Sequence, residues 1–283
     1  MQLNQVSKHV YWLPSDETTD RPVLGVVAGK NGTLIVDAGN SPAHANILLS
    51  EMSKHNIAAP SFLVLTHWHW DHVFGTAVFD IPMLAHQETK RVVEEMVHLD
   101  WNDEALDKRV ADGTEIEFCR DMMKLELPDR THLKLKSPDV SFSHRVDIDL
   151  GDVTCRIEHV GGDHAADSSV VYIPEDNIIF LSDCLYMNLY SGERSYTTQK
   201  LFPLIDKILG YNADFYLWGH DPKPMPYAEM VEYTTLLKTI GRVVDEAGNN
   251  RELIIQTLQE QFGKPLNEDD LEIVDCFLAG LVF

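Results

Sequence analysis

Thr66-His67-Trp68-His69-Trp70-Asp71-His72 is the stretch of this sequence that decides the fold. It places three histidines and an aspartate within six residues, directly after the apolar run Phe62-Leu63-Val64-Leu65. α/β folds build their sites where an apolar strand delivers polar side chains at its carboxyl end. Imidazole and carboxylate groups are preferred ligands of zinc and similar divalent ions. The stretch therefore predicts a buried strand that ends in a metal site.

The directions of the four side chains bear on the number of ions. If the strand runs on through the motif, the alternate residues His67, His69 and Asp71 share one face. His72 breaks this alternation and points elsewhere. A ligand set divided between two directions suits two metals rather than one. Any one of these histidines has an ordinary alternative as a packed or surface residue, but the density of the cluster favours metal binding.

Composition describes a globular protein with an acidic surface. The 283 residues are 44% hydrophobic, enough for a sizeable core in one large domain or two small ones. The formal net charge of −22 repels phosphate backbones and anionic membranes, so we expect neither nucleic acid nor a membrane as partner. Scattered cysteines predict no disulfide framework, and the N-terminus shows no signal segment, so a cytoplasmic location is expected. The cysteines are Cys119, Cys155, Cys184 and Cys276.

A strand–helix–strand unit precedes the cluster. Thr33–Val36 reads as a buried strand that ends at Asp37, and Ser41-Pro42 starts a helix that extends to about Lys54. The strand at 62–65 completes a βαβ unit. Asp37 has two open interpretations: it orients a metal ligand from behind, or it only forms a turn.

Three more strand ends in the second half carry one ligand-type residue each. His164, Asp183 and His220 each follow an apolar run and sit beside a small residue. Taken singly, each is a weak signal, because histidines and aspartates also cap helices. Together with the first cluster they make seven candidate ligands. That number serves two adjacent ions if one carboxylate bridges them.

The order His67-x-His69-x-Asp71-His72, then His164, Asp183 and His220, resembles the metallo-β-lactamase fold superfamily. The resemblance extends from about residue 8 to 225, with Asp37 as the first of five motifs. It implies an α/β fold class: a four-layer αβ/βα sandwich of two mixed sheets, with helices outside and the metals at the edge between the sheets. It also implies the ligand sets. His67, His69 and His164 would hold the first ion, Asp71, His72 and His220 the second, and Asp183 both.

The sequence departs from the family pattern at two places. The usual Gly-His-Thr-Pro-Gly around the third motif is replaced by Gly162-Asp163-His164-Ala165-Ala166-Asp167, and the usual glycine before the bridging acid is Ser182. Neither change removes a ligand. Both leave the subfamily open.

We divide the chain into a fold domain over 1–225 and a C-terminal helical extension over 226–283, packed on the same domain. Residues 87–145 are interpreted as a helical insertion that covers the site, with a less regular part from 100 onward. The end of the chain, 276–283, is apolar, which indicates either a docked terminus or the contact of a homodimer.

The resemblance implies a metal-dependent hydrolase of small molecules. Two divalent ions, Zn²⁺ first with Mn²⁺ or Fe²⁺ as alternatives, would share a hydroxide that attacks the carbonyl of a small ester or lactone. Asp71 would hold or accept the proton of the attacking water. Tyr186 matches the tyrosine that binds the substrate carbonyl in lactonases of this superfamily, or it is a packed aromatic residue.

Other activities stay open at this point. A glyoxalase II-type thioester hydrolase is less favoured, because residues 222–283 hold five Lys or Arg against eleven acidic residues. An oxidoreductase with one iron, like the persulfide dioxygenases, would share all seven residue types. A non-enzymatic sensor could use the same fold.

Overall fold

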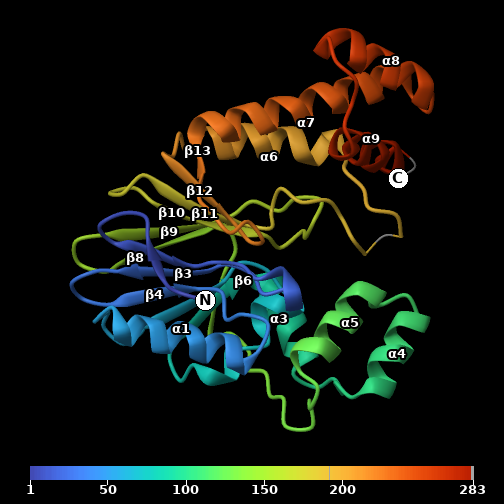
Figure 1. The fold of residues 1–283 in the computed structure, drawn as a ribbon. Coiled ribbons are helices and arrows are strands. Elements are labelled where there is room, and N and C mark those ends of the chain that lie inside the picture. Colours follow the sequence, from blue (N-terminus) through green and yellow to red (C-terminus); the bar gives the residue numbers. More distant parts are fainter. Residues whose placement is uncertain (191, 282–283) are drawn as a thin grey trace.

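The structure, a computed structural model, describes residues 1–190 and 192–281. In this part of the chain two β-sheets face each other, and helices cover both outer faces (Figure 1). The first sheet follows chain order, with antiparallel pairing from β1 to β4 and parallel pairing from β4 to β7. Its strands are β1 (Asn4–Gln5), β2 (Val10–Leu13), β3 (Leu24–Ala28), β4 (Thr33–Val36), β5 (Phe62–Leu65), β6 (Met83–His86) and β7 (Val140–Phe142).

The second sheet has the order β13-β12-β11-β10-β9-β8. Its pairs are antiparallel except β11 with β12, which run parallel. The strands are β8 (Arg145–Asp149), β9 (Thr154–His159), β10 (Ser169–Ile173), β11 (Ile178–Ser182), β12 (Phe215–Trp218) and β13 (Met225–Pro226). Both sheets are therefore mixed.

Helices before the second sheet include α1, which packs on the first sheet through the buried Leu48 and Met52. Ser41 caps α1 by accepting a hydrogen bond from the His44 backbone N–H, with Pro42 as the first helical residue, as predicted. The helices in this half are η1 (Glu17–Thr19), α1 (Pro42–Lys54), α2 (Trp70–Val73), η2 (Thr76–Val78), α3 (Gln87–Met96), α4 (Asp103–Ala111) and α5 (Glu117–Glu126).

Helices after the second sheet cover its outer face. Ile205 of α6 and Leu237 of α7 share one buried cluster with Val170 of β10. The ends of α7 and α8 fall near 247–250 and 263–265, where the sequence predicts breaks. These helices are α6 (Thr198–Leu209), α7 (Tyr227–Ala247), α8 (Arg251–Phe262) and α9 (Glu268–Gly280).

A third cluster fills the space between the sheets. It joins Val36 and Val64 of the first sheet to Phe180 and Leu217 of the second. Burial of apolar side chains on both faces of each sheet explains why these strands read as continuous hydrophobic runs. The layers thus follow the order helix, sheet, sheet, helix, and the predicted α/β class with its four-layer sandwich is confirmed.

One expectation about the histidine cluster is wrong. The strand β5 ends at Leu65, and Trp70–Val73 forms the short helix α2. His67, His69 and Asp71 therefore do not share a face through strand alternation. Polar residues that follow a buried strand are free to leave its geometry, and here the chain bends into a helical turn after His69.

The insertion also differs from its prediction. The stretch from residue 100 holds two regular helices, α4 and α5, and residues 140–142 belong to the first sheet as β7, paired in parallel with β6. Their helical pattern was hidden because α4 is largely exposed, with Leu106 as its buried residue.

The apolar end of the chain is partly docked. Cys276 and Phe277 are 3% and 2% exposed and join the cluster beneath α7. Val282 and Phe283 lie outside the described residues, and the homodimer stays a prediction. In residues 1–190 and 192–281 no helix is both long enough and apolar enough to cross a bilayer.

Candidate metal centre

The seven predicted ligands converge at one edge between the two sheets. His67 and His69 follow the end of β5, and Asp71 and His72 lie on α2. The others come from the second sheet: His164 precedes β10, Asp183 follows β11, and His220 lies two residues after β12. Because β5, β11 and β12 all deliver their carboxyl ends to this edge, residues far apart in sequence meet there.

The ligand atoms fall into two groups, and within each group all of them lie within 4.8 Å of one another. His67, His69 and His164 form the first group. Asp71, His72, Asp183 and His220 form the second. The division falls between His69 and Asp71, where the chain passes from loop to helix.

Asp183 connects the groups. Its Oδ2 lies 3.4 Å from Nε2 of His164 and 3.9 Å from Nε2 of His67, both of the first group. The same oxygen lies 3.4 Å from Nε2 of His72 and 3.4 Å from Nε2 of His220. A carboxylate in this position can serve two ions at once.

The donor atoms fit a divalent metal. Six of the seven residues are buried, and His220 is half-buried. Within residues 1–190 and 192–281 several of the donor atoms have no hydrogen-bond partner, although polar atoms rarely stay unpaired in a protein interior. A set of imidazole nitrogens and carboxylate oxygens that face one another is the arrangement that zinc and similar ions require. The unpaired atoms are Nε2 of His67, His69, His72 and His164, with Oδ2 of Asp71 and Oδ1 of Asp183.

Partners behind the ligands fix which imidazole nitrogen faces the centre. His72 Nδ1 lies 2.8 Å from Oδ2 of Asp37, and His164 Nδ1 lies 3.1 Å from the Met187 carbonyl oxygen. These contacts direct both Nε2 atoms inward and hold the tautomer that a metal needs. The structure thus favours the orienting role for Asp37, which is 1% exposed.

Burial and charge prepare the ligands for a cation. Burial lowers the pKa of His67 and His69 well below the ordinary value, so both imidazoles are neutral. Burial alone would raise the pKa of Asp71 and Asp183. The imidazoles of His72 and His220 outweigh it and hold both carboxyl pKa values well below the usual range. Burial alone would lower the pKa of His72 and His220, but the carboxylates of Asp71 and Asp183 outweigh it and raise both pKa values well above the ordinary value, so these two imidazoles must release a proton when an ion binds.

Gly219 makes room for the connecting carboxylate. A Cβ on this residue would lie 1.7 Å from Oδ1 of Asp183. The Gly219 N–H donates to the Ser182 carbonyl oxygen at 3.0 Å, so the two strand ends are held together there. A residue without a side chain is therefore required before His220.

A cavity of about 300 Å³ opens over the centre. His69, Asp71, His164, Asp183 and His220 line it from below. Its other walls come from four segments: the end of η1, the start of α2, the insertion, and the loop between β11 and α6. They contribute Asp20, Trp70, Phe118, Cys119, Tyr186, Met187, Leu189, Tyr190 and Arg194.

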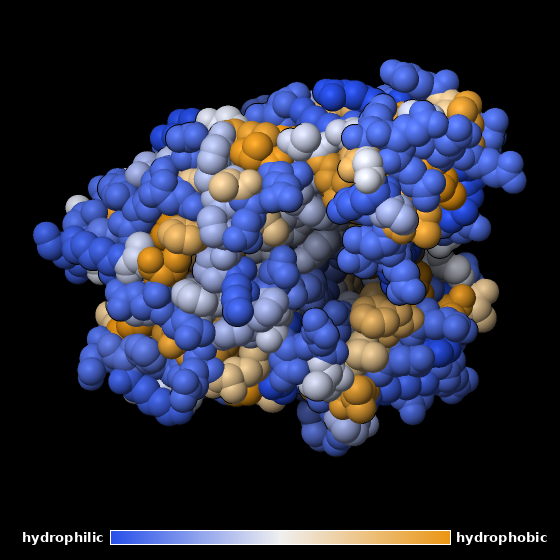
Figure 2. Space-filling model, turned by 45° about the horizontal axis from the view of Figure 1, so that its top comes forward, coloured by the Kyte–Doolittle hydropathy of each residue, from blue (hydrophilic) through white to orange (hydrophobic). Residues whose placement is uncertain are grey.

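Figure 2 shows a hollow near the middle of one face of the molecule, bordered by hydrophobic side chains on a mostly hydrophilic surface. Tyr186 lies at the cavity wall, with its ring centre 6.0 Å from that of His164 and 6.2 Å from that of His220. It is thus close enough to the ligands to meet a bound substrate, and it also packs against Trp218 at 5.3 Å.

Sequence reasoning missed the residues that join the insertion to the centre. The Tyr190 hydroxyl donates to Oε1 of Glu115 at 3.1 Å, and its ring lies 5.2 Å from that of His69. Glu115 stands just before α5, so the pair fastens that helix to the loop over the cavity. Asp20 was missed too, with Oδ1 3.4 Å from Nδ1 of His220. None of these residues belongs to a recognisable motif.

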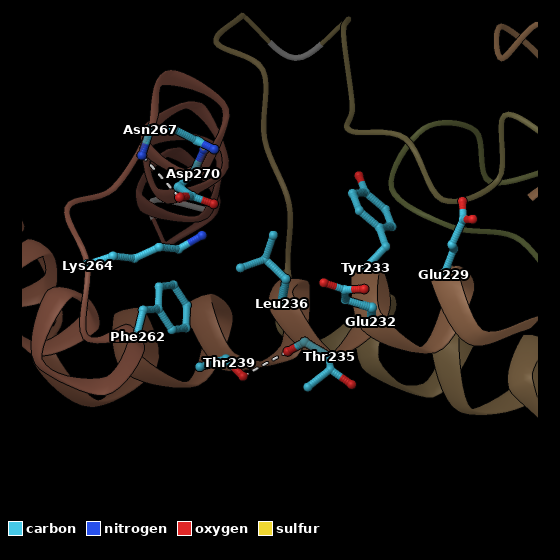
Figure 3. Close-up of a pocket in the computed structure, with 10 residues that line it drawn as sticks. All are labelled: Glu229, Glu232, Tyr233, Thr235, Leu236, Thr239, Phe262, Lys264, Asn267 and Asp270. Carbon is cyan, nitrogen blue, oxygen red and sulfur yellow. Dashed lines mark hydrogen bonds between the residues drawn. The ribbon is translucent and has the colours of Figure 1, made fainter.

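A second hollow, of about 530 Å³, lies on the C-terminal helices (Figure 3). Phe262, Leu236 and Tyr233 supply its apolar surface, and Lys264 extends over it from the connection between α8 and α9. The described residues that line it include none of the seven ligands, so we place the chemistry in the cavity over the metal centre.

Solved structures share this fold. A metallo-beta-lactamase from Pontibacter korlensis is 20% identical, with a TM-score of 0.58 over 84% of this chain and 98% of that one. A metallo-beta-lactamase family protein from Thermus thermophilus is 17% identical, with a TM-score of 0.59 over 85% and 84%. A stereoselective inverting sec-alkylsulfatase from Pseudomonas sp. is 14% identical, with a TM-score of 0.63 over 87% of this chain and 43% of that one. At these identities the likeness shows the fold alone.

A family model confirms the resemblance carried by the motifs. The model of the metallo-beta-lactamase superfamily matches residues 21–220, which is more than half of the chain and includes all seven predicted ligands. The chain therefore belongs to the metallo-β-lactamase superfamily.

Proposed function

We propose that this protein is a hydrolase that binds two divalent metal ions and opens the acyl C–O bond of a small ester or lactone. One observation carries the proposal. Oδ2 of Asp183 lies 3.4 to 3.9 Å from imidazole nitrogens of both ligand groups, which suits a carboxylate shared by two ions. His67, His69 and His164 would hold one ion, and Asp71, His72 and His220 the other.

Bound ions of this kind lower the pKa of a coordinated water to about 7 and so supply hydroxide at neutral pH. Zn²⁺ fits the donor set best, because nitrogen ligands predominate in it. The protein supplies the remaining parts of the reaction. Asp71 presents its carboxylate in the lower wall of the cavity, where it can accept a hydrogen bond from the nucleophile and pass its proton on to the leaving alkoxide oxygen.

Tyr186 would bind the substrate. Its phenol is protonated at neutral pH and can donate a hydrogen bond to a carbonyl oxygen, a bond that strengthens as negative charge develops there. The side chains of Phe118, Met187 and Leu189 surround the same cavity and suit an apolar acyl group. A volume of about 300 Å³ is at the lower end of small-molecule sites.

The residues that line the cavity disfavour a strongly anionic thioester, such as a glutathione conjugate, as the substrate. Among its described lining residues Arg194 is the one Lys or Arg, and its Nη1 is already 2.8 Å from Oε1 of Glu272. A mononuclear iron oxidoreductase would share the same seven residue types, so the test must separate it from the hydrolase. Four buried, free cysteines are compatible with the reducing cytoplasm that we propose as its location.

The test is metal content per chain on purified protein, together with hydrolysis of a lactone, a thioester and a β-lactam before and after chelation. We expect about two ions per chain and lactone hydrolysis that chelation abolishes and Zn²⁺ restores. Tyr186→Phe should keep the metal content and lower kcat by about 100- to 1,000-fold, as expected for loss of one oxyanion donor. One iron per chain without hydrolysis would refute the proposal in favour of the oxidoreductase.

A further inference from the structure

Two residues beside the centre have left-handed backbones although neither is glycine. Asp37, after β4 of the first sheet, has φ +65°, and Ser182, at the end of β11 in the second sheet, has φ +51°. Such conformations are unfavourable for residues with a Cβ and persist where the surroundings hold them. Both residues are buried, and each lies next to residues that carry or orient the ligands.

The two strained residues meet across the gap between the sheets. The Ser182 hydroxyl donates to Oδ2 of Asp37 at 3.3 Å, and the hydroxyl of Thr66 donates to Oγ of Ser182 at 2.8 Å. The Thr66 backbone N–H donates to Oδ1 of Asp37 at 2.7 Å. Asp37, Thr66 and Ser182 thus form one closed set of hydrogen bonds. They come from three strand ends in two sheets.

This set reaches both ligand groups. Nδ1 of His67 lies 3.1 Å from the Thr66 hydroxyl oxygen, and Nδ1 of His72 lies 2.8 Å from Oδ2 of Asp37. A histidine that binds metal through Nε2 carries its proton on Nδ1, so both rings donate into the set. The Thr66 hydroxyl then receives from His67. Its oxygen lies 2.8 Å from Oγ of Ser182 and also 2.8 Å from Oδ2 of Asp37, so its single proton has two acceptors, and Ser182 holds Thr66 and Asp37 together.

We infer that Ser182 is a positioning residue for the metal centre. Its hydroxyl contacts Thr66, which lies behind His67, and Asp37, which orients His72, and so it holds in place the partner of one ligand of each ion. The inference rests on the proposed function in so far as that function requires metal. Glycine, the residue implied here by the family pattern, could not supply this link.

Two substitutions separate the hydroxyl from the backbone strain. Ser182→Ala removes the hydroxyl and keeps a Cβ in the left-handed conformation, whereas Ser182→Gly removes both the hydroxyl and the strain. Ser168→Ala is a matched control. Ser168 is 2% exposed and Ser182 6%, and the hydroxyl of Ser168 has no partner in the described part of the chain.

The experiment measures Zn²⁺ affinity by competition with a chromophoric chelator, and thermal unfolding of the metal-free proteins. We expect both Ser182 variants to bind Zn²⁺ about 10- to 100-fold more weakly, the usual effect of losing a partner behind a ligand. The metal-free glycine variant should unfold at a higher temperature than the alanine variant. Co²⁺ absorption spectra of both variants should differ from that of the wild type, while Ser168→Ala matches it.

Each outcome decides a different point. Wild-type affinity in both Ser182 variants, or in the glycine variant alone, would overturn the role of the hydroxyl, because strain would then explain any effect. Weakened binding in both variants of a protein that hydrolyses none of the substrates would refute the hydrolase and leave the role of Ser182 standing. A wild-type protein that binds no Zn²⁺ would refute both.

Discussion

Replacing Gly219 by alanine tests the geometry of the metal centre with a single methyl group. The backbone at Gly219 is not left-handed, so alanine suits its conformation. The obstacle is the carboxylate of Asp183, whose Oδ1 would lie 1.7 Å from the new Cβ. Real contacts of a Cβ begin near 3.0 Å, so the oxygen must move by at least about 1.3 Å.

The strand end cannot easily give way instead. The Gly219 carbonyl oxygen accepts from the Val23 N–H at 2.6 Å, and its N–H donates to the Ser182 carbonyl oxygen at 3.0 Å. Overpacking of this kind destabilises a protein by about 1–3 kcal/mol. A shift near 1 Å in a catalytic group can reduce the rate about 100-fold. We therefore expect kcat to fall by about 100-fold or more, with at least one ion bound more weakly.

The assay is kcat on the best lactone, with metal content and the urea unfolding curve of the same preparation. Gly210→Ala is the control, because Gly210 has φ −62° and the nearest atom to its Cβ would lie 3.2 Å away. If Gly219→Ala keeps its metal and a kcat within about threefold of the wild type, the bridging position of Asp183 is wrong.

Three further predictions follow from named contacts. Asp183→Asn should lose at least one of the two metal ions that this carboxylate connects, together with all detectable turnover, measured by metal analysis and lactone hydrolysis; retained activity would contradict its role. Arg21→Ala leaves the Glu126 carboxylate, 2% exposed, without its ion pair, and should lower the free energy of unfolding by about 3–5 kcal/mol. Arg251→Ala is the control, because the ion pair of Arg251 with Asp275 is exposed and its loss should change the free energy of unfolding by under about 1 kcal/mol. Burial lowers the pKa of His44 from 6.5 to about 3. The folded-state pKa of His44 lies below the unfolded one, so protonation of this residue favours the unfolded chain. The free energy of unfolding is therefore unaffected above pH 6.5 and decreases as the pH falls toward 3, by about 2 kcal/mol between pH 7 and 5. Urea unfolding of metal-free protein should show this slope together with the contributions of His67 and His69, and His44→Leu should reduce the loss of stability between pH 7 and 5 by about 2 kcal/mol; an unchanged slope would contradict the assignment.

The local features of this fold were predictable because they depend on neighbours in sequence. Ser41 and Pro42 start α1 as their types require, and the turn at Gly151-Asp152 joins β8 to β9. The helices α4 and α5 were harder to predict, because an exposed helix has only a narrow apolar stripe. The strand at 62–65 was predicted correctly, but the shared face expected for His67, His69 and Asp71 was wrong, because alternation cannot show where a strand ends.

The sequence by itself determined the kind of chemistry. Seven imidazole and carboxylate groups placed after apolar runs indicate metal ligands, since coordination depends on residue type and strand ends gather at one edge of a sheet. Their order along the chain was enough to identify the superfamily.

The tertiary structure decided how these groups are shared and surrounded. The contact between Ser182 and Asp37 joins residues 145 positions apart, and that between Thr66 and Ser182 joins residues 116 apart. Tyr190 and Glu115 meet over 75 positions to shape the cavity. Contacts of this range arise only when the two sheets pack face to face, because the sequence pattern of each strand records which side is buried but not what it is buried against.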